Sequence, residues 1–207
     1  GWSLDDSSEL FSRDQLIDRF TIDRVGDSAA VFDIDKLSWM NGVYIRGLSD
    51  LALAKEIEPF LDVSASLASE TPGKPSLVKI VPVIKERIKT LTDADKMISF
   101  FGDEKLVYDP GLLIPKGLDT AQVATILNTV YPLLEQTDEF ATSTLEANLR
   151  SHAAQLDLKP GQVFSVLRVA LTGRTVAPPL FETMEILGKR QSLDRLREAK
   201  TLMESNS

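Results

Sequence analysis

One arginine lies inside an otherwise apolar helical pattern, and its position could serve binding chemistry. Residues 163–171 read VFSVLRVAL, with Arg168 as their only charged residue. A guanidinium in apolar surroundings needs an anionic or polar partner, because an unpaired buried charge is costly. We therefore expect Arg168 to reach the edge of its helix and present its guanidinium there. The alternative, an arginine that snorkels over the core or pairs with a carboxylate, stays open.

Two short segments concentrate positive charge, although the whole chain has a net charge of -8. The first segment holds Lys85, Arg87 and Lys89. The second holds Lys189, Arg190, Arg195, Arg197 and Lys200. Phosphate binding depends on Lys and Arg, so the net charge argues against nucleic acid while the two clusters argue for a local basic surface. The sequence thus permits RNA binding that is weak and strongly dependent on salt.

Side chains for covalent or metal chemistry are scarce in this chain of 207 residues. Cysteine is absent, and the single histidine, His152, lies in a polar helical pattern typical of a solvated surface. The sequence has no Gly-rich phosphate loop and no nucleophile beside a base. The lack of cysteine excludes disulfides and fits a reducing cytosol, so we expect a cytoplasmic protein. No apolar run approaches the length of a membrane span.

The helix that carries Arg168 has clear boundary signals. Pro160 suits a first helical turn, where the missing N–H is tolerated, and Gly173 suits a left-handed C-terminal cap. Pro178-Pro179 cannot continue a helix and predicts an extended bend. A further helix is expected from Leu180 to a stop at Gly188.

Helical spacing of apolar residues dominates the rest of the chain, with no alternating stretch that would predict a strand. The residues expected to cap helices are Ser12, Asp33, Ser49, Asp119 and Ser192. The helix after Asp33 is expected to be interrupted at Asn41-Gly42. Its inward residues are expected to be Leu37, Met40, Tyr44 and Ile45. Another helix is expected over residues 76–91, bent at Pro82. The predicted fold class is all-α.

Three segments carry a resemblance to a known family. These are VFDIDKLSWMNGVYIRGLS, KERIKTLTD, and VLRVALTGR followed by PPLFETMEILGK. In this order they resemble the C-terminal stem-contact and anticodon-binding region of bacterial-type glutamyl-tRNA synthetases, class I glutamate–tRNA ligases. The resemblance covers nearly the whole chain. The chain opens without Met, on GWSLDD, and we expect it to be a piece of a longer protein.

The resemblance implies roles for six residues. Lys36 and Trp39 match family positions that lie against the inner stem of tRNA, although Trp39 could equally be a core anchor. Arg87 matches an arginine that reads the third anticodon base, which is C for glutamate and G for glutamine. A rigid donor fork can separate the edges of these bases. Arg168 matches an arginine that helps to read the first anticodon base. Pro178 and Leu180 match a bend that packs on the same base.

The resemblance also implies an architecture. We expect a helical stem-contact region in residues 1–50, followed by two small helical bundles, in residues 51–104 and 105–207, that form an anticodon-binding cage. The partner would be the anticodon loop and inner stem of tRNA(Glu), bound by a monomer. ATP and Mg²⁺ would belong to a missing catalytic half, so this chain alone would hold no cofactor and charge no tRNA. The alternatives are an all-helical protein–protein scaffold, or a fragment that binds RNA too weakly to matter.

Overall fold

The computed structural model describes residues 2–5, 9–26, 31–62, 75–103 and 105–205. Within these ranges the chain forms nine α-helices and four short 3-10 helices. The described residues form no strand, apart from an isolated bridge between Trp2 and Val25. The predicted all-α fold is confirmed. No helix in the described ranges is both long enough and apolar enough to cross a membrane.

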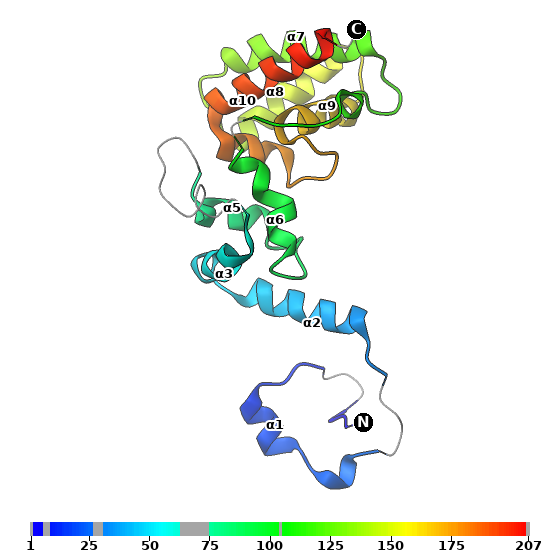
Figure 1. Ribbon diagram of the computed structural model, residues 1–207, viewed down its shortest axis with the longest axis vertical. Coiled ribbons are helices and arrows are strands. Elements are labelled where there is room, and N and C mark those ends of the chain that lie inside the picture. Colours follow the sequence, from blue (N-terminus) through cyan, green and yellow to red (C-terminus); the bar gives the residue numbers. More distant parts are fainter. Residues whose placement is uncertain (1, 6–8, 27–30, 63–74, 104, 206–207) are drawn as a thin grey trace.

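The elements follow one another along the long axis of the molecule (Figure 1). At one end lie α1 (Arg13–Arg19), η1 (Ile22–Arg24) and α2 (Ile34–Gly47). Next come α3 (Asp50–Ile57), η2 (Glu58–Phe60), α5 (Leu77–Ile84), α6 (Asp93–Ile98) and η3 (Ser99–Phe101). At the other end lie η4 (Pro110–Leu113), α7 (Thr120–Glu135), α8 (Thr142–Gln155), α9 (Pro160–Thr172) and α10 (Leu180–Glu204).

Four of the five predicted helix caps are confirmed. The side chains of Ser12, Asp33, Ser49 and Asp119 each accept a hydrogen bond from a backbone N–H of the first turn of the helix that follows. These bonds satisfy donors that a helix leaves unpaired at its start. The prediction for Ser192 is wrong, because this residue is buried inside α10. Gly188, where the sequence predicted a helix stop, is non-helical at φ 76° and ψ 166°, so α10 consists of two helical segments that meet there at a kink.

The largest part of the core lies in the C-terminal bundle, where α10 packs against α7, α8 and α9. These helices bury an almost uninterrupted set of aliphatic side chains, and the same hydrophobic cluster continues into α3, α5 and α6. Helix α10 also touches α5, so the bundle and the middle of the chain share a packed junction. The predicted division at residues 50 and 104 stays a prediction.

Helix α2 differs from its prediction in two ways. It runs without interruption through Gly42, where an added Cβ would meet Nη1 of Arg46 at 3.1 Å. The glycine therefore makes room for an arginine of the next turn, and among the described residues no backbone from outside α2 lies within 3.8 Å of the added Cβ. Ile45 is buried as expected, but Leu37 and Tyr44 are exposed. Helical periodicity indicated a helix correctly and assigned an inner face that is largely uncovered.

Candidate nucleic-acid interface

Arg87 lies just after the carboxyl end of α5. The helix ends at Ile84, several residues before the predicted end at residue 91, and the Arg87 N–H donates to the carbonyl of Ile84 at 2.8 Å in a closing turn. The next residue, Ile88, is 1% exposed and anchors the turn in the core. The Arg87 side chain is exposed, and no carboxylate of the described residues lies within ion-pair distance of it.

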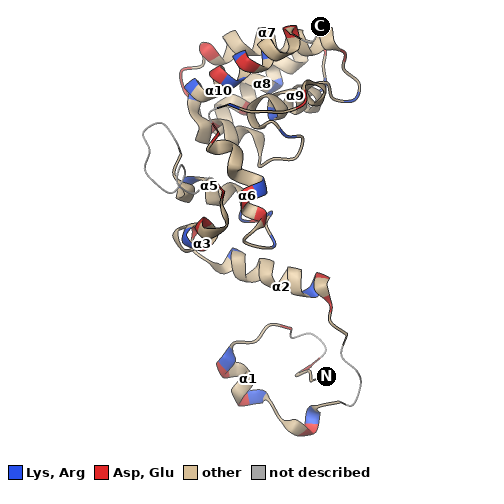
Figure 2. Cartoon of the chain, in the orientation of Figure 1, with Lys and Arg blue, Asp and Glu red and all other residues tan. Residues whose placement is uncertain are grey.

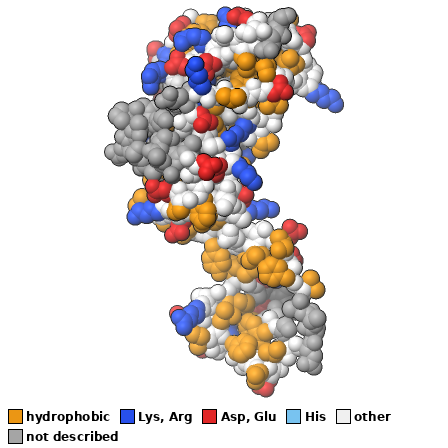
Figure 3. Space-filling model, in the orientation of Figure 1, with side chains coloured by type: hydrophobic (Ala, Val, Ile, Leu, Met, Phe, Trp, Pro, Cys, Tyr) orange, Lys and Arg blue, Asp and Glu red, His pale blue; other side chains and the backbone are white. Residues whose placement is uncertain are grey.

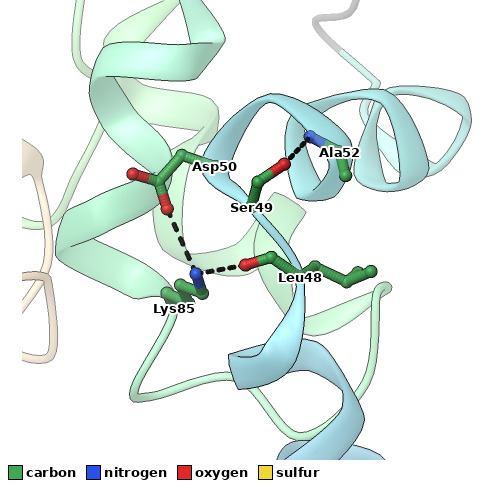
Figure 4. Close-up of polar contacts among 5 residues, drawn as sticks. All are labelled: Leu48, Ser49, Asp50, Ala52 and Lys85. Atoms are coloured by element: carbon green, nitrogen blue, oxygen red, sulfur yellow. Dashed lines mark hydrogen bonds and ion pairs between the residues drawn. The ribbon is translucent and has the colours of Figure 1, made fainter.

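The turn that carries Arg87 is held against the junction of α2 and α3. The Lys85 ammonium donates to the carbonyl of Leu48 and to Oδ1 of Asp50, the latter at 3.2 Å (Figure 4). On the other side of Arg87, the Asn41 amide donates to the carbonyl of Lys89 at 2.5 Å. Residues on both sides of Arg87 are thus tied to α2 or its end, which leaves the arginine side chain free while its backbone is fixed.

Lys85 therefore has a structural role, and this corrects the reading of its cluster as a uniform basic surface. Its side chain is only 18% exposed. Its ammonium satisfies a carbonyl at the carboxyl end of α2, where a positive charge also suits the helix dipole. Of the cluster of Lys85, Arg87 and Lys89, Arg87 and Lys89 keep their side chains exposed.

Arg168 projects from α9 between two buried residues, Leu167 and Val169. Helix α9 begins at Pro160 and ends at Thr172, capped by Gly173 with a left-handed φ of 70°, so both predicted boundaries are confirmed. The Arg168 side chain is half-buried. No carboxylate lies within ion-pair distance of it in the part of the chain that the structure describes. The alternative of an ion-paired arginine therefore finds no support among these residues.

Arg87 and Arg168 come close enough to influence each other, although they lie 81 positions apart in the sequence. Burial lowers the pKa of Arg168, and the positive charge of Arg87 lowers it further. Two guanidiniums that repel each other without a compensating carboxylate favour the approach of an anion or of an acceptor-rich ligand. The charge of Arg87 thus acts on Arg168, a residue that sequence reasoning singled out separately.

Lys36 and Trp39 lie on the first turns of α2, before Asn41, the residue that contacts the turn carrying Arg87. The Lys36 ammonium pairs with Oε1 of Glu9 at 2.8 Å, in a contact that leaves both side chains nearly half exposed. Trp39 is 46% exposed. An indole with that exposure presents a large apolar and hydrogen-bonding surface to a partner, so its surroundings do not match the alternative of a core anchor.

Pro178 and Leu180 form the bend between α9 and α10, and both are buried. Leu180 is 4% exposed and belongs to the core of the bundle. Its side chain therefore leaves little surface for direct contact with a base. The pair shapes the bend between the two helices, while Thr175 and Val176 are the exposed residues of the same loop.

The second basic cluster is not a continuous basic surface. Arg195 is 3% exposed, and burial lowers its pKa to about 10. Lys189 donates to the carbonyl of Thr137 at 2.9 Å, and Arg197 donates to Asp194 and to the Tyr131 hydroxyl. Acidic residues interleave with the remaining cations on these helices (Figure 2). The prediction that this second cluster forms a basic surface is therefore wrong.

Sequence reasoning counted Arg195 as a surface cation, but the sequence contained a signal to the contrary. Arg195 lies three residues after Ser192 and four before Ala199, and both of these are buried. Such spacing places the three residues on one face of a helix. The small side chains on that face indicated a buried side on which an arginine needs carbonyl partners.

Comparison with known proteins identifies relatives of the chain. The family model described as anticodon binding domain matches residues 52–200. A glutamate–tRNA ligase of Dehalococcoides mccartyi is 44% identical over 202 residues, which are 96% of this chain and 41% of that protein. A glutamate–tRNA ligase of Roseiflexus sp. is 42% identical over an alignment of 210 residues that covers 100% of this chain and 41% of that protein. The chain thus spans about two fifths of the length of these relatives.

A solved structure supports the fold. The crystal structure of a glutamate tRNA ligase from Elizabethkingia meningosepticum, in complex with its amino acid, matches this chain with a TM-score of 0.82. The match covers 98% of this chain and 39% of the other, at 24% sequence identity. At that identity the likeness shows a shared arrangement of helices and nothing finer.

Proposed function

Because the chain belongs to the family of anticodon binding domains, we propose that it binds the anticodon arm of tRNA(Glu) as part of a glutamate–tRNA ligase. The observation that carries the proposal is that neither Arg87 nor Arg168 has a carboxylate partner among the described residues, while the charge of Arg87 lowers the pKa of Arg168. Unstacked bases of an RNA loop offer such donors both phosphate oxygens and base edges.

In this proposal the two arginines read different bases. Arg87 recognises the third anticodon base, with its backbone fixed by the contacts of Lys85 and Asn41. Arg168 reads the first base, beside the bend at Pro178 and Leu180, and these two buried residues act by shaping the backbone. Lys36 and Trp39 contact the inner stem. The exposed face of α2 that carries Trp39 is available for that contact.

The proposal extends to the whole protein. Relatives about two and a half times as long bear the name glutamate–tRNA ligase, and we propose the same activity for the longer protein. It would join glutamate to tRNA in the cytoplasm, as a monomer. ATP and Mg²⁺ would be bound outside residues 1–207. The present chain would supply recognition.

A titration with tRNA(Glu) at low and moderate salt tests the binding. We expect an affinity that falls steeply with salt, because phosphate contacts release counterions. The protein–protein scaffold, the alternative function, predicts binding that is absent or independent of salt. Either of those results would remove the proposed function.

Discrimination at the third anticodon base is the sharper test. Arg87→Ala should cost about 1–3 kcal/mol in binding and bring the affinities for tRNA(Glu) and tRNA(Gln) closer together. Arg87→Lys keeps the charge but loses the planar fork, so it should keep the salt dependence and lose much of the discrimination. Arg190→Ala, on an exposed part of α10, is the matched control and should change neither. An unchanged ratio in Arg87→Ala would exclude this role for Arg87.

A further inference from the structure

The buried Arg195 connects two segments that are distant in sequence. From α10, its Nη1 donates to the carbonyl of Leu171 at 2.5 Å. Its Nη2 donates to the carbonyls of Phe100 at 2.6 Å and Asp103 at 3.1 Å. Leu171 lies in the last turn of α9, and Phe100 and Asp103 lie at the end of η3 and just after it. One guanidinium thus satisfies carbonyls at two helix ends, which would otherwise lack donors.

Arg174 makes a second connection between the same two regions. It follows α9 directly, and its guanidinium donates to the carbonyl of Lys96 and to Oγ of Ser99, the latter at 2.6 Å. The Cζ atoms of Arg174 and Arg195 each lie 5.9 Å from the ring centroid of Phe100, which is fully buried. Phe100 is therefore enclosed by two arginines that both start from the C-terminal bundle.

These contacts lie between the two elements that carry the anticodon-reading arginines of the proposed function. Segment 96–103 comprises the end of α6, η3 and the two residues after it; α6 packs on α5, and Arg87 lies in the turn after α5. Arg168 lies on α9, one turn before Leu171. A change in the position of Phe100 would therefore shift Arg87 relative to Arg168. Hydrogen bonds to fixed carbonyls resist such a shift better than apolar packing alone, because their geometry is directional.

We infer that Arg174 and Arg195 are positioning residues: by clamping segment 96–103 to the end of α9, they set the spacing between Arg87 and Arg168. The effect on RNA recognition rests on the proposed function, whereas the clamp itself does not. Neither arginine needs to touch RNA in this account. Their contribution is to hold two recognition side chains at the distance that suits the first and third anticodon bases of one loop.

A distance measurement tests the clamp without RNA. The chain has no cysteine, so Lys79→Cys on α5 and Ala147→Cys on α8 would carry the only spin labels. Both residues are exposed. We expect a narrow distance distribution that broadens or shifts in Arg174→Met and Arg195→Met. A control label pair at Asn128 and Ala147, inside the C-terminal bundle, should stay unchanged. Unchanged distributions for both label pairs would overturn the inference.

Arg195→Met could unfold the chain, because it leaves buried carbonyls without donors. Arg174 is only half-buried, so its variants keep the test decisive if Arg195→Met does not fold. Arg174→Lys should restore part of the narrow distribution, because an ammonium can reach one of the two acceptors. If Arg174→Met remains folded and gives the same distance distribution as the labelled chain that keeps Arg174, the clamp does not exist.

RNA binding then separates this inference from the proposed function. The probe is a hairpin with the anticodon loop of tRNA(Glu), carrying C or G at the third anticodon position. Arg174→Met should lower the C-to-G affinity ratio by about three- to tenfold, as coupling through intermediate residues commonly does. Arg190→Met should leave the ratio intact. An unmodified chain that fails to bind RNA would remove the proposed function, while the label distances would still decide on the clamp. A ratio unchanged in Arg174→Met would reject its positioning role.

Discussion

The two ends of the molecule use the same helical pattern with different results. In the bundle of α7 to α10, most of the large aliphatic side chains are buried. In residues 16–44, by contrast, large apolar side chains are exposed (Figure 3). They are Leu16, Ile17, Phe20, Ile22, Val25, Val31, Phe32, Ile34, Leu37, Trp39 and Tyr44. Exposed apolar surface on this scale is typical of regions that contact another molecule or another part of a protein.

This difference teaches that periodicity predicts a helix more reliably than it predicts burial. A helix forms where its caps and propensities allow, as Asp33 and its bond to the Lys36 N–H show for α2. Burial requires a second apolar surface within reach, and in the bundle the neighbouring helices provide it. Under the proposed function, the stem of the tRNA and the rest of the ligase are the partners of the N-terminal region.

The largest expected effect comes from the same substitution made in both regions. Leu149→Ala removes a fully buried side chain of α8 and should lower the free energy of unfolding by about 2–5 kcal/mol. Leu37→Ala, at a residue that is 49% exposed, should change it by less than about 0.5 kcal/mol. Urea unfolding of both variants gives the two values. Equal losses would mean that the N-terminal region is packed as tightly as the bundle, and the comparison would fail.

Replacing a glycine by alanine should change the stability in opposite directions in the two regions. Gly173→Ala puts a side chain at φ 70° and within 3.2 Å of Cδ1 of Tyr108, so it should destabilise the chain by about 1–2 kcal/mol. An added Cβ in Gly47→Ala, at the end of α2, meets no atom of the described residues within 4 Å, so this change should stabilise the chain by about 0.4–1 kcal/mol through a less flexible unfolded state. Thermal melts compare the two variants. A loss of stability in Gly47→Ala would show that the end of α2 is under a constraint of its own.

A polar contact in the bundle should also contribute more to stability than a similar contact near the N-terminus. Ala141 cannot cap α8, and Glu185 of α10 does so instead: the Thr142 N–H and hydroxyl donate to Oε2 of Glu185 at 2.6 and 2.5 Å. Glu185→Gln should cost about 0.5–1 kcal/mol at neutral pH. The exposed pair of Glu9 and Lys36 should contribute less, so Glu9→Gln should be close to neutral.

The pH dependence of this cap can be predicted. The hydrogen bonds from the Thr142 side chain and backbone lower the pKa of Glu185 below its ordinary value of 4.5. Its stabilising contribution is therefore present above pH 4.5 and is lost as the pH falls through the lower pKa of the folded state. In urea titrations, the difference between the original chain and Glu185→Gln should shrink below pH 4.5. A difference that stays constant down to about pH 3 would exclude the ionised carboxylate as the cap.

Much of the fold was predictable from local sequence signals, because caps and helix ends depend on neighbours in the chain. Ser12, Asp119, Pro160 and Gly173 mark boundaries that the structure confirms. The roles of the cations were less predictable. Lys85 and Arg195 bind carbonyls that are 37 and up to 95 positions away, and only the tertiary fold brings these together. The nearness of Arg87 and Arg168 depends on the same long-range packing.

The smallest expected effect concerns the exposed end of α2. Lys36→Met should leave the stability nearly unchanged, because it breaks only the exposed pair with Glu9. If Lys36 contacts the inner stem of tRNA, the slope of log affinity against log salt should fall by about one. Lys200→Met, at an exposed residue of α10 to which we assign no RNA contact, should keep the original slope. Because the Lys36 ammonium must exchange a carboxylate for a phosphate, Glu9→Gln should raise the affinity slightly. If the slope of log affinity against log salt is the same in Lys36→Met and Lys200→Met, Lys36 does not contact the tRNA stem.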